Sequence, residues 1–190
     1  ALINFLVPAL SLISILMCLA PRMGFQQNWL VFIINIVLTT HIAALTHELM
    51  HEPKSSTDWN WLLKINLHLY SPATLGFDEL RRLHLLHHLH ADTPSDPDYF
   101  LIDGGRLRSF FVLAFAPEFW FFSALRMKET QPNFWALQTI RIFLFAMFLY
   151  ALGWKDFMIL FYIPSKISFA IGFLIFSYES HTDSTGNNHD

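Results

Sequence analysis

The side chains most able to do chemistry in this chain are five histidines in two short motifs, HELMH and HLLHH. They are His47 and His51 in the first motif, and His84, His87 and His88 in the second. Residues three or four positions apart share one face of a helix, so each motif on a helix presents its imidazoles together. The first motif also matches the zinc-protease pattern, in which Glu48 would be the general base. Because imidazole binds both zinc and iron, the motifs predict a metal site and leave the metal open.

The number of histidines bears on the number of metals. The chain holds 10 histidines in 190 residues. One zinc or iron ion seldom takes more than four or five side chains, so five or more converging imidazoles favour two metals. His181, in FSYESH, follows the last apolar segment and offers a sixth ligand. Two acidic groups, Asp96 and Asp98, follow the second motif and are candidate acceptors for imidazole N–H groups, as is Glu48 in the first.

The elements that position these residues are apolar segments long enough to cross a bilayer. The composition is 54% hydrophobic and 14% charged, against roughly 25% charged in soluble domains. About 20 apolar residues suffice for one span. The sequence predicts spans at residues 2–20, 29–47, 134–152 and 157–176, in a single all-α membrane domain covering residues 1–190. The short turns pair the spans into two transmembrane helical hairpins.

Residues 52–133 lie between the hairpins and are predicted to be cytosolic or interfacial helices. Eight of the 12 lysines and arginines lie there, and an excess of basic residues marks the cytosolic side. The histidine motifs are therefore expected at the cytosolic membrane face. The apolar piece 109–125 contains Pro117 and Glu118 at its centre. It is predicted to lie on the membrane surface, which keeps His181 on the same side as the other histidines.

The sequence also bears on partners. The net charge is −3 and the basic residues form no long tract, so no nucleic-acid partner is expected. No GxGxxG motif and no CxxC pair is present, so electrons for redox chemistry must come from an external ferredoxin or cytochrome-like donor. Arg81, Arg82, Arg106 and Arg108 could steer an acidic donor, although topology signals and headgroup contacts explain them more simply.

Taken together, the motifs resemble the histidine boxes of the integral-membrane fatty acid desaturases and hydroxylases. The boxes HxxxH and HxxHH are matched at His47 and His51 and at His84, His87 and His88, followed by Asp96-Pro97-Asp98. The order HLLHHLHADTPSDPDYFLIDGG and later FSYESH is most similar to the carotenoid hydroxylase and ketolase branch. The resemblance implies two non-haem iron ions, O2 and an apolar lipid substrate that is desaturated or hydroxylated.

The chain departs from that family in one respect. A later HxxHH box, several tens of residues beyond the position of His181, has no counterpart here. The sequence also begins without methionine, so we expect a domain incomplete at both ends. Six imidazoles are few for two irons, and the 190-residue piece alone is expected to bind metal poorly and to be inactive.

A second function remains open, that of an intramembrane zinc protease. It would use HELMH together with LIDGG at residues 101–105, where Asp103 resembles the aspartate ligand of site-2 proteases. This interpretation leaves HLLHH and the two aspartates without a role. Substrate, regiochemistry, electron donor and oligomeric state are not determined by the sequence.

Overall fold

The computed structural model describes residues 2–24, 27–52, 71, 73–91, 93–99, 111–127 and 132–182, with side chains for those from 5 to 172. Every regular element in these ranges is helical, which confirms the all-α prediction. In chain order they are α1 (Leu2–Leu19), the 3-10 helix η1 (Ala20–Met23), α2 (Asn28–His51), α5 (Phe77–His90), α8 (Ala116–Met127), α9 (Phe134–Leu152), α10 (Trp154–Phe157), the π-helix η2 (Met158–Tyr162) and α11 (Ile163–Thr182).

Three helices are long and apolar enough to cross a membrane among the residues described. They are Phe5–Met23, Asn28–His51 and Phe134–Leu152. The third has the bounds predicted from the sequence. The second extends past the predicted end at residue 47, so HELMH forms the last turns of the same helix that carries the apolar run. The span predicted at 157–176 lies within the helical stretch from α10 through α11 and stays a prediction.

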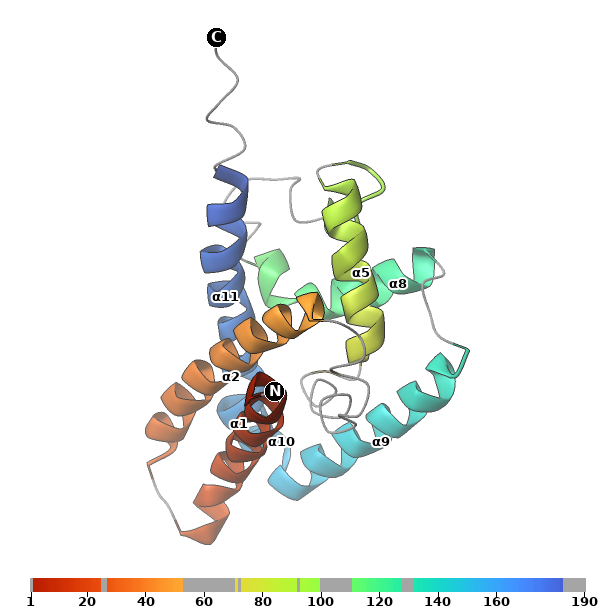
Figure 1. Ribbon diagram of the computed structural model, residues 1–190. Coiled ribbons are helices and arrows are strands. Elements are labelled where there is room, and N and C mark those ends of the chain that lie inside the picture. The colour runs from red at the N-terminus through yellow and green to blue at the C-terminus, as the bar shows by residue number, and fades with distance from the viewer. Residues whose placement is uncertain are drawn as a thin grey trace.

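The two hairpins meet around α2, which packs against both α1 and α11 (Figure 1). Their turns lie at the same end of the molecule, where Arg22, after α1, donates a hydrogen bond of 2.5 Å to the carbonyl of Leu152 at the end of α9. That carbonyl is among those a helix end leaves without an intrahelical partner. Gly153 follows with φ 75°, a conformation that L side chains rarely adopt.

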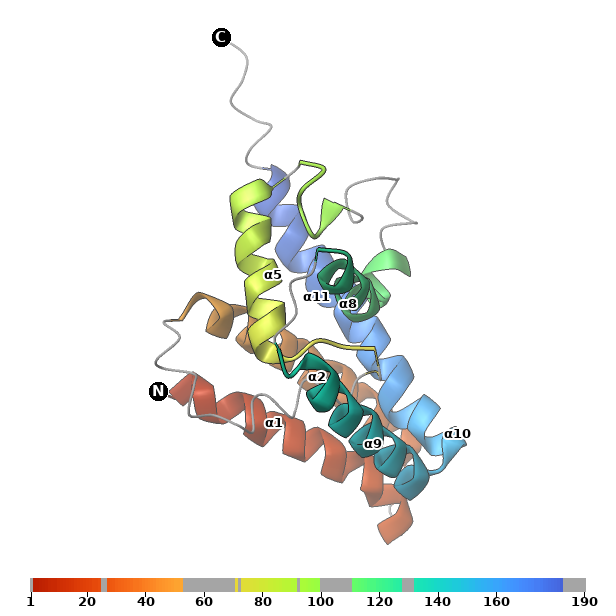
Figure 2. The ribbon, with the colours of Figure 1, turned by 90° about the vertical axis from the view of Figure 1, so that its right-hand side faces the viewer.

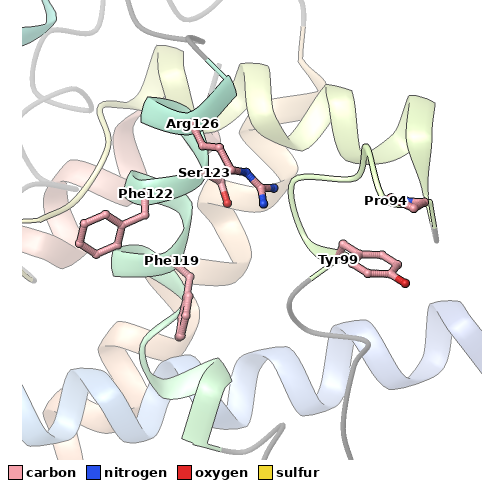
Figure 3. A pocket seen from close by; sticks show the side chains of 6 residues that line it. All are labelled: Pro94, Tyr99, Phe119, Phe122, Ser123 and Arg126. Carbon is pink, nitrogen blue, oxygen red and sulfur yellow. The ribbon is translucent and has the colours of Figure 1, made fainter.

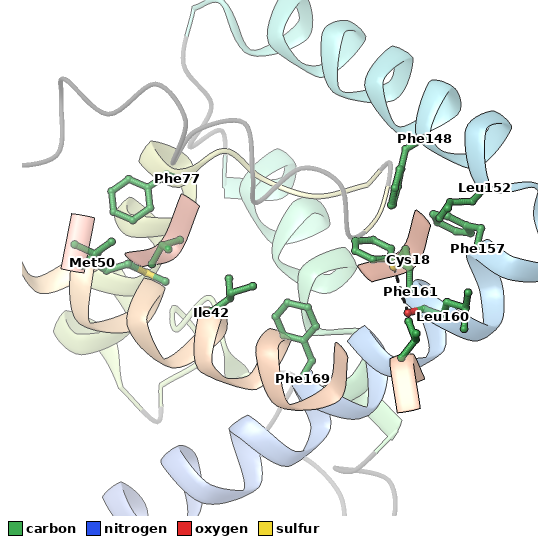
Figure 4. Close-up of a cluster of buried hydrophobic side chains, with 13 residues drawn as sticks. Cys18, Ile42, Met50, Phe77, Phe148, Leu152, Phe157, Leu160, Phe161 and Phe169 are labelled. Atoms are coloured by element: carbon green, nitrogen blue, oxygen red, sulfur yellow. Dashed lines mark hydrogen bonds between the residues drawn. The ribbon is translucent and has the colours of Figure 1, made fainter. Parts of the chain in front are cut away.

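Buried apolar side chains from α1, α2, α5, α9, α10, η2 and α11 form the main core (Figure 4). A buried polar contact crosses it. Pro164 has no N–H with which to bond Leu160 four residues earlier, so the carbonyl of Leu160 is left for an outside donor. Asn35 donates to it from α2 at 2.7 Å, and the thiol of Cys18 in α1 lies 3.5 Å away. The π-turn η2 thus ties three helices together.

The apolar piece predicted as one surface helix over 109–125 is two helical pieces where the structure describes it. Residues 111–114 are helical, the chain turns at Phe115, and α8 then begins at Ala116. Proline has no N–H to donate, so Pro117 fits the start of a helix and not its interior. The break therefore falls where the sequence placed its proline. Figure 2 shows α8 beside α5 and α11.

Two basic residues inside apolar helices form buried ion pairs. Arg141 of α9 lies near enough to a span end for its side chain to reach water, but it is 4% exposed and pairs with Glu79 of α5 at 3.7 Å. Lys166 of α11 lies 2.5 Å from Glu118 of α8. Charge inside a membrane helix is expensive unless paired. The pairs join the apolar helices to the two shorter helices between the hairpins.

Candidate metal centre

The first histidine motif lies at the C-terminal end of α2. Thr46, Leu49 and Met50 of this segment are buried, and they fix the rotation of the helix against its neighbours. His47 is half-buried and His51 is exposed. The sequence prediction that the two imidazoles share a side of the helix therefore holds, with ring centroids 5.1 Å apart.

The second motif lies on α5, a short amphipathic helix. Phe77 and Leu83 are buried on one side of it, whereas leucines 85 and 89 are exposed. Asp78 and Glu79 occupy its first turn, where negative charge complements the helix dipole. Gly76 precedes the helix, and a Cβ there would overlap both the Arg141 guanidinium and the Glu79 carboxylate. The start of α5 is therefore fitted closely to α9.

The two motifs meet. The ligand nitrogens of His47, His51 and His84 all lie within 4.8 Å of one another. Nε2 of His84 is 3.0 Å from Nε2 of His51 and 3.1 Å from Nε2 of His88. The ring of His87 lies 5.6 Å from that of His88, centroid to centroid. All five predicted imidazoles therefore form one contiguous cluster between α2 and α5.

Two imidazoles of the cluster, those of His84 and His88, are held in the protonation state that binds a metal. Burial, and after it the neighbouring imidazoles, lower the pKa of His84 from 6.5 to about 3. Burial and His51 likewise lower the pKa of His88. Neutral imidazole is the form that binds a metal. At neutral pH these side chains are therefore lone-pair donors gathered around a small volume, a donor set that fits zinc, iron or a similar ion.

The loop of residues 93–99, which we call the carboxylate loop because it carries Asp96 and Asp98, bonds His87. Nδ1 of His87 lies 2.9 Å from Oδ1 of Asp96, which is 0% exposed, and 3.8 Å from Asp98. The backbone N–H of Asp98 donates to Asp96 at 2.7 Å, and the indole N–H of Trp120 on α8 donates to Asp98 at 2.6 Å. Such partners fix the tautomer and orientation of an imidazole ligand. The hydrogen-bond chain thus runs from α8 to His87.

The first motif has a weaker carboxylate contact. Glu48 lies 3.6 Å from Nδ1 of His47, and its side chain is 65% exposed. A carboxylate in solvent holds a ring less firmly than a buried one, because water competes for both groups. The three predicted acidic partners therefore lie next to imidazoles, with Asp96 making the closest contact.

A shallow hollow of about 260 Å³ borders the same loop (Figure 3). It lies between α8 and residues 93–99 and is walled by Tyr99, Phe119 and Phe122, with Arg126 reaching into it. The histidine cluster does not contribute to its described lining. Ser123 on its wall donates to the carbonyl of Pro97, so the hollow and the carboxylate loop share a boundary.

The remaining candidates lie elsewhere. His181 is in the last turn of α11, and its side chain is outside the part the structure describes. The C-terminal ends of α5 and α11 lie at the same end of the molecule in Figures 1 and 2. Asp103 of LIDGG is outside the described residues, as are Arg106 and Arg108. His41, six residues before His47, has Nδ1 at 2.8 Å from the Val37 carbonyl.

A family model for fatty acid desaturases matches residues 26–190. The chain belongs to the fatty acid desaturase family. It is therefore an oxidoreductase of a family of membrane enzymes that act on lipids, and the histidine cluster fits the histidine-box site of that family. No curated protein and no solved structure gives a significant match. Desaturase membership confirms the enzyme class predicted from the paired motifs.

Sequence reasoning missed three side chains that position this desaturase site. Arg81 bonds the end of α2, Trp120 bonds Asp98, and Glu79 pairs with Arg141. Each contact joins residues at least 22 positions apart. Short motifs do not report such pairings. The unusual positions of Arg141 in an apolar run and of Glu79 on the apolar side of α5 were the available signals.

Proposed function

We propose that the chain is a di-iron, O2-dependent oxidoreductase whose histidine boxes act at the cytosolic membrane face on an apolar lipid chain. The observation that carries the proposal is the convergence of both boxes, with His51 and His84 in contact across two helices. Family membership supports iron and a lipid substrate. The proposed ligands are His47, His51, His84, His87, His88 and His181.

The metal ions and the acidic side chains would have different roles. When bound, two ferrous ions would supply the oxidising chemistry that removes hydrogen from an unactivated methylene with O2, which no side chain can do. Asp96 would accept a hydrogen bond from the Nδ1–H of His87 and so leave Nε2 as the ligand atom. Asp98 and Glu48 would orient neighbouring rings more weakly. Electrons would come from an external ferredoxin or cytochrome-like donor, since the sequence has no cofactor motif of its own.

Within the family, we propose the hydroxylase and ketolase branch. The support is in the sequence: DPDYF follows the second box, Gly104-Gly105 comes next, and FSYESH ends in a single histidine. The aromatic hollow borders the loop that bonds His87 and offers an apolar wall for a lipid chain. Product analysis in a host supplied with lipids and carotenoids tests this branch. A new double bond in acyl chains, with no alcohol or ketone formed, would assign the chain to desaturation instead.

The competing zinc-protease function explains less of the site. A zinc protease would require His47, Glu48 and His51 with an aspartate, and the second histidine box would have no function in it. In the structure His84 and His88 contact His51, so the second box belongs to the same cluster. The distinction is testable because a protease loses its general base in Glu48→Gln. A di-iron oxidase keeps most of its metal in that variant.

Metal content is the direct test of the proposal. The protein, expressed from its complete reading frame and purified in detergent, is expected to contain iron approaching two ions per chain. His84→Ala removes the imidazole that contacts both boxes and is expected to lose most of that iron. His41→Ala, an exposed histidine of α2 bonded within its own helix, is the matched control and is expected to keep it. Stoichiometric zinc, with proteolysis abolished by Glu48→Gln, would overturn the proposal.

A further inference from the structure

Arg81 connects the two helices that carry the histidine boxes. It lies on α5, three residues before His84, and therefore on the same side of that helix. Its Nε donates to the carbonyl of Met50 at 2.9 Å, and its Nη2 donates to the carbonyl of Glu52. These two residues flank His51 in the chain. The guanidinium thus binds the backbone on both sides of one predicted ligand.

The carbonyls it binds need an outside partner. The last carbonyls of an α-helix have no intrahelical donor, and they carry the negative end of the helix dipole. At the end of α2 the N–H of Glu52 donates to the carbonyl of Leu49 at 3.3 Å, and Arg81 donates to the next carbonyl, that of Met50. A charged donor to a helix end makes a stronger bond than a neutral donor does. Arg81 is half-buried, so the bond is only partly screened by solvent.

The Arg81 hydrogen bonds also bear on the distance between His51 and His84. The hydrogen bond from Arg81 to the Met50 carbonyl lies next to the contact between His51 and His84, whose Nε2 atoms are 3.0 Å apart. The Arg81 side chain adds two hydrogen bonds to the backbone of this segment, beside the contact between the imidazoles. Without it, the end of α2 would lose both of these bonds to α5. Small changes in the orientation of a ligand ring are costly to a metal site.

We propose that Arg81 is a positioning residue of the metal centre, which holds His51 in register with His84. This inference rests on the proposed function, because it assumes that these imidazoles bind a metal. It assigns Arg81 to the interior of the site and removes it from the set of arginines that could steer an electron donor. Arg82 is exposed and remains on that surface.

The test measures Co²⁺ affinity by visible absorption, which reports both binding and the geometry around the ion. In Arg81→Gln we expect affinity to fall about 10–100-fold, the usual effect of removing a group that orients a ligand. The absorption envelope should also shift, while helix content by circular dichroism is retained. Arg82→Gln, the adjacent arginine, is the matched control and should bind like the parent. Arg81→Lys keeps the charge and one donor, and should fall between the two.

A double-variant comparison separates positioning from general loosening. If Arg81 acts through His51, adding Arg81→Gln to His51→Ala should cost no further affinity, whereas adding it to His87→Ala should cost the full factor. Equal costs in both backgrounds would overturn the inference, as would a parent-like affinity and spectrum in Arg81→Gln. Failure of the unsubstituted protein to bind Co²⁺ or iron would instead overturn the proposed function. If Arg81→Gln does not fold, Arg81→Lys in the same two backgrounds decides the matter.

Discussion

The two helices that supply the imidazoles are held in different ways. α2 has 24 residues and packs along its length against α1 and α11, with apolar side chains such as Val31, Ile42 and Leu49 fully buried. α5 has 14 residues and packs Phe77 and Leu83 into two apolar clusters. It depends in addition on polar contacts, including Glu79 with Arg141 at one end and the Asp96 bond to His87 near the other. The first box therefore lies on a helix packed along its length, and the second lies on a shorter packed helix that is also held by buried polar contacts.

This difference teaches where the site is vulnerable. Apolar packing is spread over many contacts, so α2 tolerates the loss of any one of them better than a buried charge tolerates the loss of its partner. The second box should therefore respond sharply to several single polar substitutions, whereas the first box should respond sharply only at Arg81, which bonds the end of α2. The next three predictions test that asymmetry, from the largest expected effect to the smallest.

The largest effect is expected at the base of α5. Glu79→Leu removes the ion-pair partner of the buried Arg141 guanidinium, and breaking a buried pair in this way typically costs about 3–5 kcal/mol. A lower thermal midpoint in detergent and a loss of metal are expected together. Adding Arg141→Met removes the second charge and should restore much of the midpoint. If the double variant is no more stable than Glu79→Leu, the ion pair does not hold α5 as described.

The next effect concerns the carboxylate loop. Asp96→Asn keeps the shape of the side chain but weakens its hold on His87, so metal affinity should fall about 10–100-fold. The thermal midpoint should fall less than in Glu79→Leu, because the loop keeps its other contacts. Glu48→Gln is the matched change on the first box and should alter affinity by less. A larger loss in Glu48→Gln than in Asp96→Asn would reverse the comparison.

The smallest effect is expected at Trp120. Trp120→Phe retains an aromatic ring in α8 but removes the N–H donated to Asp98 at 2.6 Å. The loss of one such hydrogen bond costs about 1 kcal/mol. Metal affinity should fall severalfold, measured by the same Co²⁺ titration, with little change in helix content. Trp135→Phe, an exposed tryptophan of α9, serves as the control.

Much of this arrangement follows from local sequence patterns. The bounds of α9 match the prediction, because its apolar run begins and ends sharply at Phe134 and Leu152. The shared helix face within each box followed from the histidine spacing, and the convergence of the two boxes was predicted from placing both at one membrane face. α2 continues to His51, past the predicted end at residue 47. The hydropathy falls at HELMH, but the helix continues, and Arg81 bonds its end. A hydropathy argument detects the apolar layer and not the helix end.

The contacts that fix the second box could not be read in this way. Asp96 and Asp98 were expected near imidazoles, but which ring they reach depends on the turn at residues 93–99 and on Trp120 from another helix. The partners of Arg141 and Lys166 are 62 and 48 residues away, respectively, since Arg141 meets Glu79 and Lys166 meets Glu118. Charge in an apolar run signals that a partner exists. Its identity emerges only when the helices pack.

The length of α2 bears on how metal ions and lipid chains reach the site. At about 1.5 Å per residue, its 24 residues extend roughly 36 Å, whereas the hydrocarbon layer is about 30 Å thick. The surplus is about one turn, comparable to HELMH itself. An upright α2 would deliver its imidazoles to the boundary where dissolved metal arrives from water and oily chains arrive from the lipid. Lengthening the helix by one residue would turn that ending by about 100° and point its imidazoles away from His84.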